Sequence, residues 1–303
     1  MKKREVLFAI LAIVLILPLA SAGLMDFITG KDVANQLPTN MQAEIGNTAP
    51  QITYVADIPA QTPTEANSKA VIFKVTVYDH DSNIPAVDDM SAGSVLAKFT
   101  KTGETTRSTT CSATGGEAAG ANKNYTCTID IWYWDGAGSW TVNVTASDNS
   151  AANATNDTTT LTINSLTAFT LAPSTITWGI LSPGAPDQSA INDPSILNNT
   201  GNYVVSAGNI KINATDLIGF TDPSNTIGAG NFTSAITDPA CTGDQLSTGI
   251  FTPITGANLD KGNLSIGSGT AQQTLYYCLD VPSSVTKQNY TASGANAWTI
   301  KIA

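Results

Sequence analysis

Residues 71–78 read Val-Ile-Phe-Lys-Val-Thr-Val-Tyr. This stretch decides the fold class because every second residue, from 71 to 77, is an apolar Val or Phe. The same two-residue period returns in residues 125–133, 140–146 and 160–163. Such a period predicts half-buried antiparallel strands. Turn residues such as Asp135-Gly136-Ala137-Gly138 separate the segments. We therefore expect an all-β chain in which residues 49–165 form a first β-sandwich of about seven strands.

The second half of the chain also predicts β-structure, with longer spacing between strands and loops richer in Gly and Ser. The expected strands cover residues 175–178, 209–213, 249–254, 275–281 and 297–303. In the last of these, Trp298, Ile300 and Ile302 share one face. We expect a second β-sandwich over residues 166–303, with a boundary near residues 165–168 and little linker between the domains.

Two segments of the first half resemble a known architecture. Val75-Thr-Val-Tyr-Asp79-His-Asp81-Ser-Asn83 and Gly138-Ser-Trp140-Thr-Val-Asn-Val-Thr-Ala-Ser-Asp148 are similar to strands of PKD and cadherin-like modules, which recur in secreted prokaryotic, often archaeal, surface proteins. In the second half, Trp178-Gly-Ile-Leu-Ser-Pro-Gly184 and Asn199-Thr-Gly-Asn202 are similar to β-sandwich repeats of envelope proteins. The resemblance implies two immunoglobulin-like β-sandwich domains in tandem.

The first 22 residues have the layout of a secretory signal peptide. Lys2, Lys3 and Arg4 precede an apolar run over residues 6–19, which is short for a membrane span, and the small residues Ala20-Ser21-Ala22 follow. We expect cleavage after residue 22 and a secreted or cell-surface protein. Residues 23–48 then form an extended arm or linker, either a tether or an arm that adds a strand to another subunit.

The composition excludes some classes of function. Only 13% of the residues are charged and 42% are hydrophobic, so the chain can bury cores. The formal net charge is -10, and an acidic surface disfavours nucleic-acid phosphates. His80 is the single histidine, no nucleophile is placed beside it by the sequence, and no phosphate-binding glycine loop occurs. We expect no enzyme, no nucleic-acid partner and no certain cofactor.

The four cysteines are expected to form disulfides, because an even count in a secreted chain favours pairing. Three connectivities are open, but Cys111 with Cys127 and Cys241 with Cys278 need no contact between domains. A zinc site is disfavoured because Cys-x-x-Cys is absent from the sequence.

Asn-x-Ser/Thr acceptor sites for glycans are frequent and are a second sign of export. They occur at Asn124, Asn143, Asn153, Asn156, Asn198, Asn213, Asn231, Asn263 and Asn289. Asn124, Asn143 and Asn213 fall on the outward phase of predicted strands, where a glycan leaves the core undisturbed.

A calcium site is the best metal candidate. Asp79-x-Asp81-x-Asn83 offers alternating oxygen ligands of the kind that Ca²⁺ takes. If residues 71–78 and 140–146 are strands B and F of a sandwich, both run toward one pole, and Asp148 and the segment around Asn47 meet there. The alternative is a solvated acidic turn.

Trp132 and Trp134 lie by phase on the polar side of their strand. An exposed Trp pair can stack on sugar rings, so the pair is a candidate carbohydrate site. The alternative is that an adjacent loop or the second domain covers both rings.

These observations predict a non-enzymatic, secreted, glycosylated structural or adhesion protein of a cell surface. Its partners would be other surface proteins, copies of itself or glycans. Two alternatives stay open: a subunit of an extracellular filament assembled by strand donation from the N-terminal arm, and a carbohydrate-binding module.

Overall fold

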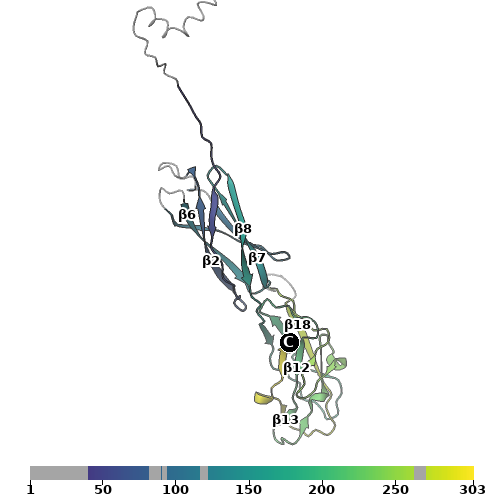
Figure 1. Ribbon diagram of the computed structural model, residues 1–303. Helices are drawn as coiled ribbons and strands as arrows, with labels where there is room; N and C mark the ends of the chain where they lie inside the picture. The colour runs from purple at the N-terminus through teal and green to yellow at the C-terminus, as the bar shows by residue number, and fades with distance from the viewer. Residues whose placement is uncertain (1–39, 82–89, 91–93, 117–121, 263–270) are drawn as a thin grey trace, which may run out of the picture. The chain divides into compact units, whose positions relative to one another are not determined.

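The computed structural model describes residues 40–81, 90, 94–116, 122–262 and 271–303, and the regular secondary structure of these residues is almost entirely β (Figure 1). The predicted signal peptide, the arm up to residue 39, Asn83 and Asn263 lie outside the described residues. The helical segments of the described chain are short 3-10 turns, at Ala229–Asn231, Ala240–Thr242 and Gly294–Asn296. None of the helices in this part of the chain is long and apolar enough to cross a membrane. The all-β prediction is confirmed.

Eight strands form the part that we call the N-terminal sandwich. They are β1 Gln51–Val55, β2 Ser68–Tyr78, β3 Ser94–Thr100, β4 Arg107–Thr110, β5 Ser112–Gly116, β6 Asn122–Trp132, β7 Gly138–Ser147 and β8 Asn153–Ile163. One sheet has the order β1-β2-β6-β5 and the other β4-β3-β7-β8, all antiparallel. If β4 is taken as an added strand and the other seven strands are lettered A to G in chain order, the sheets are A-B-E-D and C-F-G, with β4 paired to strand C. This is the immunoglobulin-type strand order.

The two sheets of the N-terminal sandwich enclose one apolar core, because each strand buries alternate residues. β2 buries Val71, Phe73, Val75 and Val77, as the sequence predicted. The rings of Phe73 and Phe99 stack across the two sheets with their centroids 5.8 Å apart. Burial of side chains of this size stabilises the fold by about 1.5–3 kcal/mol each.

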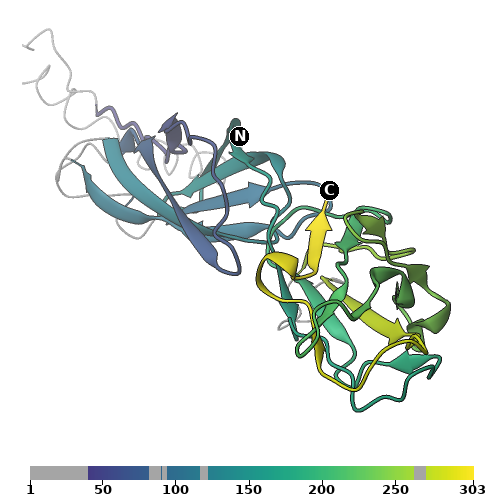
Figure 2. The same cartoon turned by 90° about the horizontal axis from the view of Figure 1, so that it is seen from below.

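Twelve strands of the described residues, most of them short, form the part that we call the C-terminal region (Figure 2). They are β9 Phe169–Ala172, β10 Gln188–Ser189, β11 Ser195–Asn199, β12 Ile210–Asn213, β13 Leu217–Gly219, β14 Thr226–Ile227, β15 Phe232–Ala235, β16 Asp244–Gln245, β17 Thr252–Pro253, β18 Gln272–Leu279, β19 Tyr290–Thr291 and β20 Thr299–Ile302. Their sheets run β16-β15-β18-β11-β9, β17-β12-β20 and β14-β13-β19. A second core cluster lies among them, with Phe232, Leu197 and Tyr277 at its centre. The domain boundary at residues 165/166 stays a prediction.

The strand predictions for the C-terminal region have mixed outcomes. Those at residues 209–213, 275–281 and 297–303 are confirmed by β12, β18 and β20, and the one at 249–254 shrinks to the two residues of β17. The strand predicted at residues 175–178 is wrong. Its apolar alternation is present, but no neighbouring strand pairs with it.

Both disulfides have the pairing that the spacing favoured. Cys111 is joined to Cys127 and Cys241 to Cys278, with Cα–Cα distances of 4.3 Å and 5.0 Å. The first links the segment between β4 and β5 to β6, and the second links a 3-10 turn to β18. The Cys111–Cys127 bond lies in the core cluster of the N-terminal sandwich, and the Cys241–Cys278 bond cross-links the C-terminal region.

Candidate functional site

The acidic pole of the N-terminal sandwich is the first candidate site, and we define it by Asp79, Asp81 and Asp148. Asp79 and Asp148 are buried, and the chain reaches them through Asn47 and Thr48. The Asn47 side-chain amide donates to Asp148 at 3.0 Å, and the backbone N–H of Thr48 donates to Asp81. Strand direction alone predicted that residues near 47, 81 and 148 share one pole, and these contacts confirm it.

The carboxylates of the acidic pole already hold the backbone of the pole in place. Asp148 accepts bonds from the N–H groups of Ser150 at 2.9 Å and Ala152 at 2.8 Å, and Asp79 accepts one from the N–H of Asp81 at 3.1 Å. These are the bonds by which Asp shapes a turn. The carboxylates therefore shape a turn, but Asp79 and Asp148 are buried, so the turn is not the solvated one that the sequence offered as the alternative.

A calcium ion would need more ligands than this arrangement brings together. Within the described ranges, the group of three acidic, His or Cys ligand atoms that lie within 4.8 Å of one another is Asp187, Cys241 and Cys278, and its two sulfurs are bonded to each other. Asn83, the predicted third ligand of the loop, lies outside the described residues. Calcium binding at Asp79, Asp81, Asn83 and Asp148 stays a prediction, for which titration of the protein with millimolar Ca²⁺ is the direct check.

The turn between β6 and β7, at the opposite end of the N-terminal sandwich, is built around a buried ion pair. Asp135 is 1% exposed and accepts two bonds from Arg107 Nε at 3.1 Å and one from Arg107 Nη2 at 2.6 Å. The backbone N–H of Trp132 donates to the same carboxylate at 2.8 Å. Removing a carboxylate from water costs free energy, which several hydrogen-bonding partners must offset. This turn supplies such partners for Asp135.

The two candidate sugar-binding tryptophans lie at this turn. The rings of Trp132 and Trp134 stack at 4.7 Å, Tyr133 packs edge-on against Trp134, and the Arg107 guanidinium lies 5.7 Å from the Trp134 ring. Trp134 is 7% exposed and Trp132 is half-buried. Coverage, the alternative that the sequence left open, describes Trp134. Sugar binding by the pair stays a prediction that rests on the open part of Trp132.

One buried asparagine links this turn to the C-terminal region. The Asn202 amide donates to the carbonyl oxygens of Asp135 at 2.8 Å and Asn164 at 3.0 Å, and its oxygen accepts from the N–H of Leu166 at 2.6 Å. The backbone of the preceding Gly201 lies close to the backbone of Leu166. A side chain does not fit there, since a Cβ at position 201 would lie 2.1 Å from the carbonyl oxygen of Leu166. The similarity of Asn199-Thr-Gly-Asn202 to envelope repeats was the only sequence signal for this contact.

Further polar contacts surround Asn202, and we call the whole set the junction. Thr200 donates its hydroxyl to Glu65 at 2.8 Å, and the N–H of Ala66 donates to the Thr200 carbonyl at 3.0 Å. Lys261 forms an ion pair with Glu104 at 2.6 Å. The junction therefore joins three loops of the N-terminal sandwich to two separate segments of the C-terminal region.

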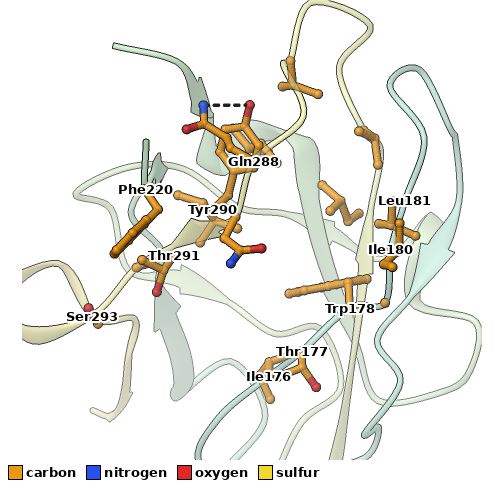
Figure 3. A pocket seen from close by; sticks show the side chains of 18 of the residues that line it. Ile176, Thr177, Trp178, Ile180, Leu181, Phe220, Gln288, Tyr290, Thr291 and Ser293 are labelled. Carbon is orange, nitrogen blue, oxygen red and sulfur yellow. Dashed lines mark hydrogen bonds between the residues drawn. The ribbon is translucent and has the colours of Figure 1, made fainter. Parts of the chain in front are cut away.

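A groove with a volume of about 1340 Å³ opens in the C-terminal region (Figure 3). Trp178, Ile180 and Leu181 stand on one side of it, with Phe220 and Thr291 on the other. Residues of the second core cluster also line it, namely Ile227, Leu279 and Val281. The groove therefore opens onto the hydrophobic core.

The described acceptor asparagines differ in exposure. Asn124, Asn153 and Asn289 are exposed, and Asn143, Asn156, Asn198, Asn213 and Asn231 are half-buried. Of the described acceptor sites, none is fully buried. Occupancy of these sites stays a prediction.

Two titratable groups of the second core cluster have shifted pKa values. Burial raises the pKa of the Tyr277 hydroxyl well above its usual range. Burial also raises the pKa of Asp193, the charge of Asp238 adds to the rise, and a bond from the N–H of Tyr277 opposes it. Tyr277 is 1% exposed, and Asp193 is half-buried beside it.

A scan against protein-family models and a search of curated proteins each found no match for this chain. The resemblance to PKD and cadherin-like modules therefore rests on the quoted segments alone and stays a prediction.

Proposed function

We propose that this chain is a non-enzymatic structural protein of the cell surface, in which the two β-rich parts act together as one stiff spacer. The observation that carries the proposal is the junction. A spacer transmits force or holds distance only if its parts do not swing, and interfaces between domains of one chain swing by default unless they are extensive.

The chemistry of the junction supports stiffness. The side chain of Asn202 is 4% exposed and makes three hydrogen bonds, so any hinge motion would leave buried polar atoms without partners. Each such loss costs about 1–3 kcal/mol. The Lys261–Glu104 pair and the Thr200–Glu65 bond restrain the same motion at other points.

The proposed location outside the cell is supported by the signal-like residues 1–22, the acceptor asparagines and both disulfides, which persist in oxidising compartments. Surface glycans would keep sheet edges from pairing with other chains. Its partners would be other surface proteins or further copies of this chain.

Mass spectrometry of the native protein, after protease treatment of intact cells, tests the location. We expect an N-terminus at Gly23, intact disulfides and glycans on exposed acceptor sites such as Asn124 and Asn153. A full-length, unmodified chain with reduced thiols inside the cell would contradict the proposal.

Distance measurements between spin labels test the stiffness. Labels at Asp130→Cys and Ile250→Cys, both exposed positions on either side of the junction, should give one narrow distance distribution. Asn202→Ala should broaden it, because the three bonds are lost. Asn209→Ala, at a half-buried position in the same region, is the matched control and should leave it narrow. A broad distribution in the unmodified protein would refute the spacer.

A further inference from the structure

We propose that the groove of the C-terminal region binds residues 23–39, the N-terminal arm, of a second copy of this chain as an added β-strand. This inference goes beyond the spacer function, since it names how copies would join end to end. It also identifies the acceptor site of the strand-donation alternative, which the sequence did not locate.

The first argument is an unpaired backbone edge along the groove. On one side of the segment, Thr177 bonds to Asn192 Oδ1 through its N–H and to the N–H of Ile191 through its carbonyl, both at 2.9 Å. The backbone groups of Ile176, Trp178 and Ile180 form no hydrogen bond to any described residue. Alternate residues of an extended chain point their backbone groups to opposite sides, so Ile176 and Trp178, which flank Thr177, present an open edge for a strand, and the chain bends at Ile180.

The second argument is the opposite side of the groove. β19 ends its sheet, whose order is β14-β13-β19, and Tyr290 and Thr291 line the groove. An added strand therefore has one open edge and one edge strand beside it, which is the setting for β-strand addition. The misassigned strand at residues 175–178 has the same explanation: its pattern is that of a strand and its partner is missing.

The third argument is size and chemistry. Small-molecule pockets hold about 300–1,000 Å³, and this groove is larger. Ile180 is fully exposed and Phe220 is 79% exposed, although both are large apolar residues. An exposed apolar patch that continues into a core fits an occupant with several apolar side chains in a row.

The arm has that chemistry. Residues 24–28 read Leu-Met-Asp-Phe-Ile, four large apolar side chains in five residues. Five residues of strand span about 17 Å. Residues 40–46, which connect the arm to the acidic pole, are exposed and belong to no helix or strand, as a connecting segment would be.

Strand directions place the acidic pole, which the chain reaches through Asn47, and the groove on opposite sides of the junction. β7 runs from Gly138, next to the junction, to Ser147, next to the acidic pole where the chain enters β1. β9 runs from Phe169, next to the junction, toward Ser174, where the lining of the groove begins. Donor and acceptor are therefore different surfaces, and such heterologous contacts generate chains of subunits.

A complementation experiment with the full chain tests the proposal. Phe27→Asp should remove the donor and Ile180→Asp the acceptor, and each variant alone should be monomeric in analytical ultracentrifugation. Mixed together, they should form a one-to-one dimer that grows no further, because each retains the half that the other lacks. Ile250→Asp, at a position 61% exposed in the same region and outside the groove, is the control and should assemble like the unmodified chain.

A titration supplies a readout that does not depend on assembly. A synthetic peptide of residues 23–39 should bind the Phe27→Asp chain one-to-one and change the fluorescence of Trp178. Adding Ile180→Asp should weaken that binding at least tenfold, and a peptide of scrambled order should not bind. An unmodified chain that stays monomeric, variants that assemble alone, or peptide binding unaffected by Ile180→Asp would each overturn the proposal. A monomer that keeps a narrow spin-label distance would leave the spacer function standing.

Discussion

The N-terminal sandwich and the C-terminal region build their hydrophobic cores by different means. The first uses long ladders: β2, β6 and β8 each have 11 residues, and β2 and β6 pair with a strand on each side. The second has a longest strand of 8 residues, β18, and several strands of two. There, side chains such as Asn192 and Asn199 bond the backbone where ladders are missing. The difference teaches that cross-links and side-chain bonds replace ladder length in the C-terminal region.

The disulfides should show this difference most strongly. Replacing Cys241 and Cys278 by Ser removes a cross-link between residues 37 positions apart, and replacing Cys111 and Cys127 removes one of 16. In the chain-entropy model these losses cost about 4 and about 3 kcal/mol. We expect loss of the Cys241–Cys278 bond to lower the urea midpoint of unfolding more than loss of the Cys111–Cys127 bond does. Circular dichroism measures the unfolding. Equal or reversed effects would show that the C-terminal region does not depend more on its cross-link.

The buried ion pair of the N-terminal sandwich should give the next largest effect. Asp135→Asn removes the charge that Arg107 binds, and breaking a buried pair costs roughly 3 kcal/mol. Unfolding in urea, followed by tryptophan fluorescence, measures the loss. Asp130→Asn is the matched control, because Asp130 is exposed on β6, and we expect it to change stability by less than about 0.5 kcal/mol. If the two variants lose the same stability, long ladders alone hold the N-terminal sandwich.

The junction should give a smaller effect on stability than on stiffness. Asn202→Ala leaves the carbonyls of Asp135 and Asn164 without their shared donor, and we expect a loss of about 2 kcal/mol. In calorimetry, the two parts of the unmodified protein should melt in one step. In the Asn202→Ala variant, they should melt in two separate steps. One unchanged melting step in the variant would mean that the other junction contacts suffice.

The sequence predicted the N-terminal sandwich well because period-two patterns in residues 71–78 and 140–146 are long enough to fix both strand and face. It also predicted the shared pole of Asp81 and Asp148, since strand direction is enough to place chain ends. The junction could not be predicted, because the three bonds of Asn202 depend on where Asp135, Asn164 and Leu166 come together after folding. The segment at residues 175–178 failed for a related reason: a strand pattern says nothing about whether a partner strand exists.

The smallest expected effect concerns pH and again separates the two parts. Because the pKa of Asp193 is raised in the folded state, mainly by burial, the folded protein holds this proton more tightly than the unfolded chain. Its contribution to stability is therefore present below the unfolded pKa and is lost as pH rises through the folded pKa. Asp193→Asn keeps an oxygen that can accept the bond from the N–H of Tyr277, at 2.9 Å, but removes the charge. The variant should gain stability relative to the unmodified protein as pH rises from acidic to neutral, in unfolding curves of the C-terminal region. Asp187→Asn, exposed in the same region, should show no such trend, and a trend shared by both variants would assign the effect to general surface charge.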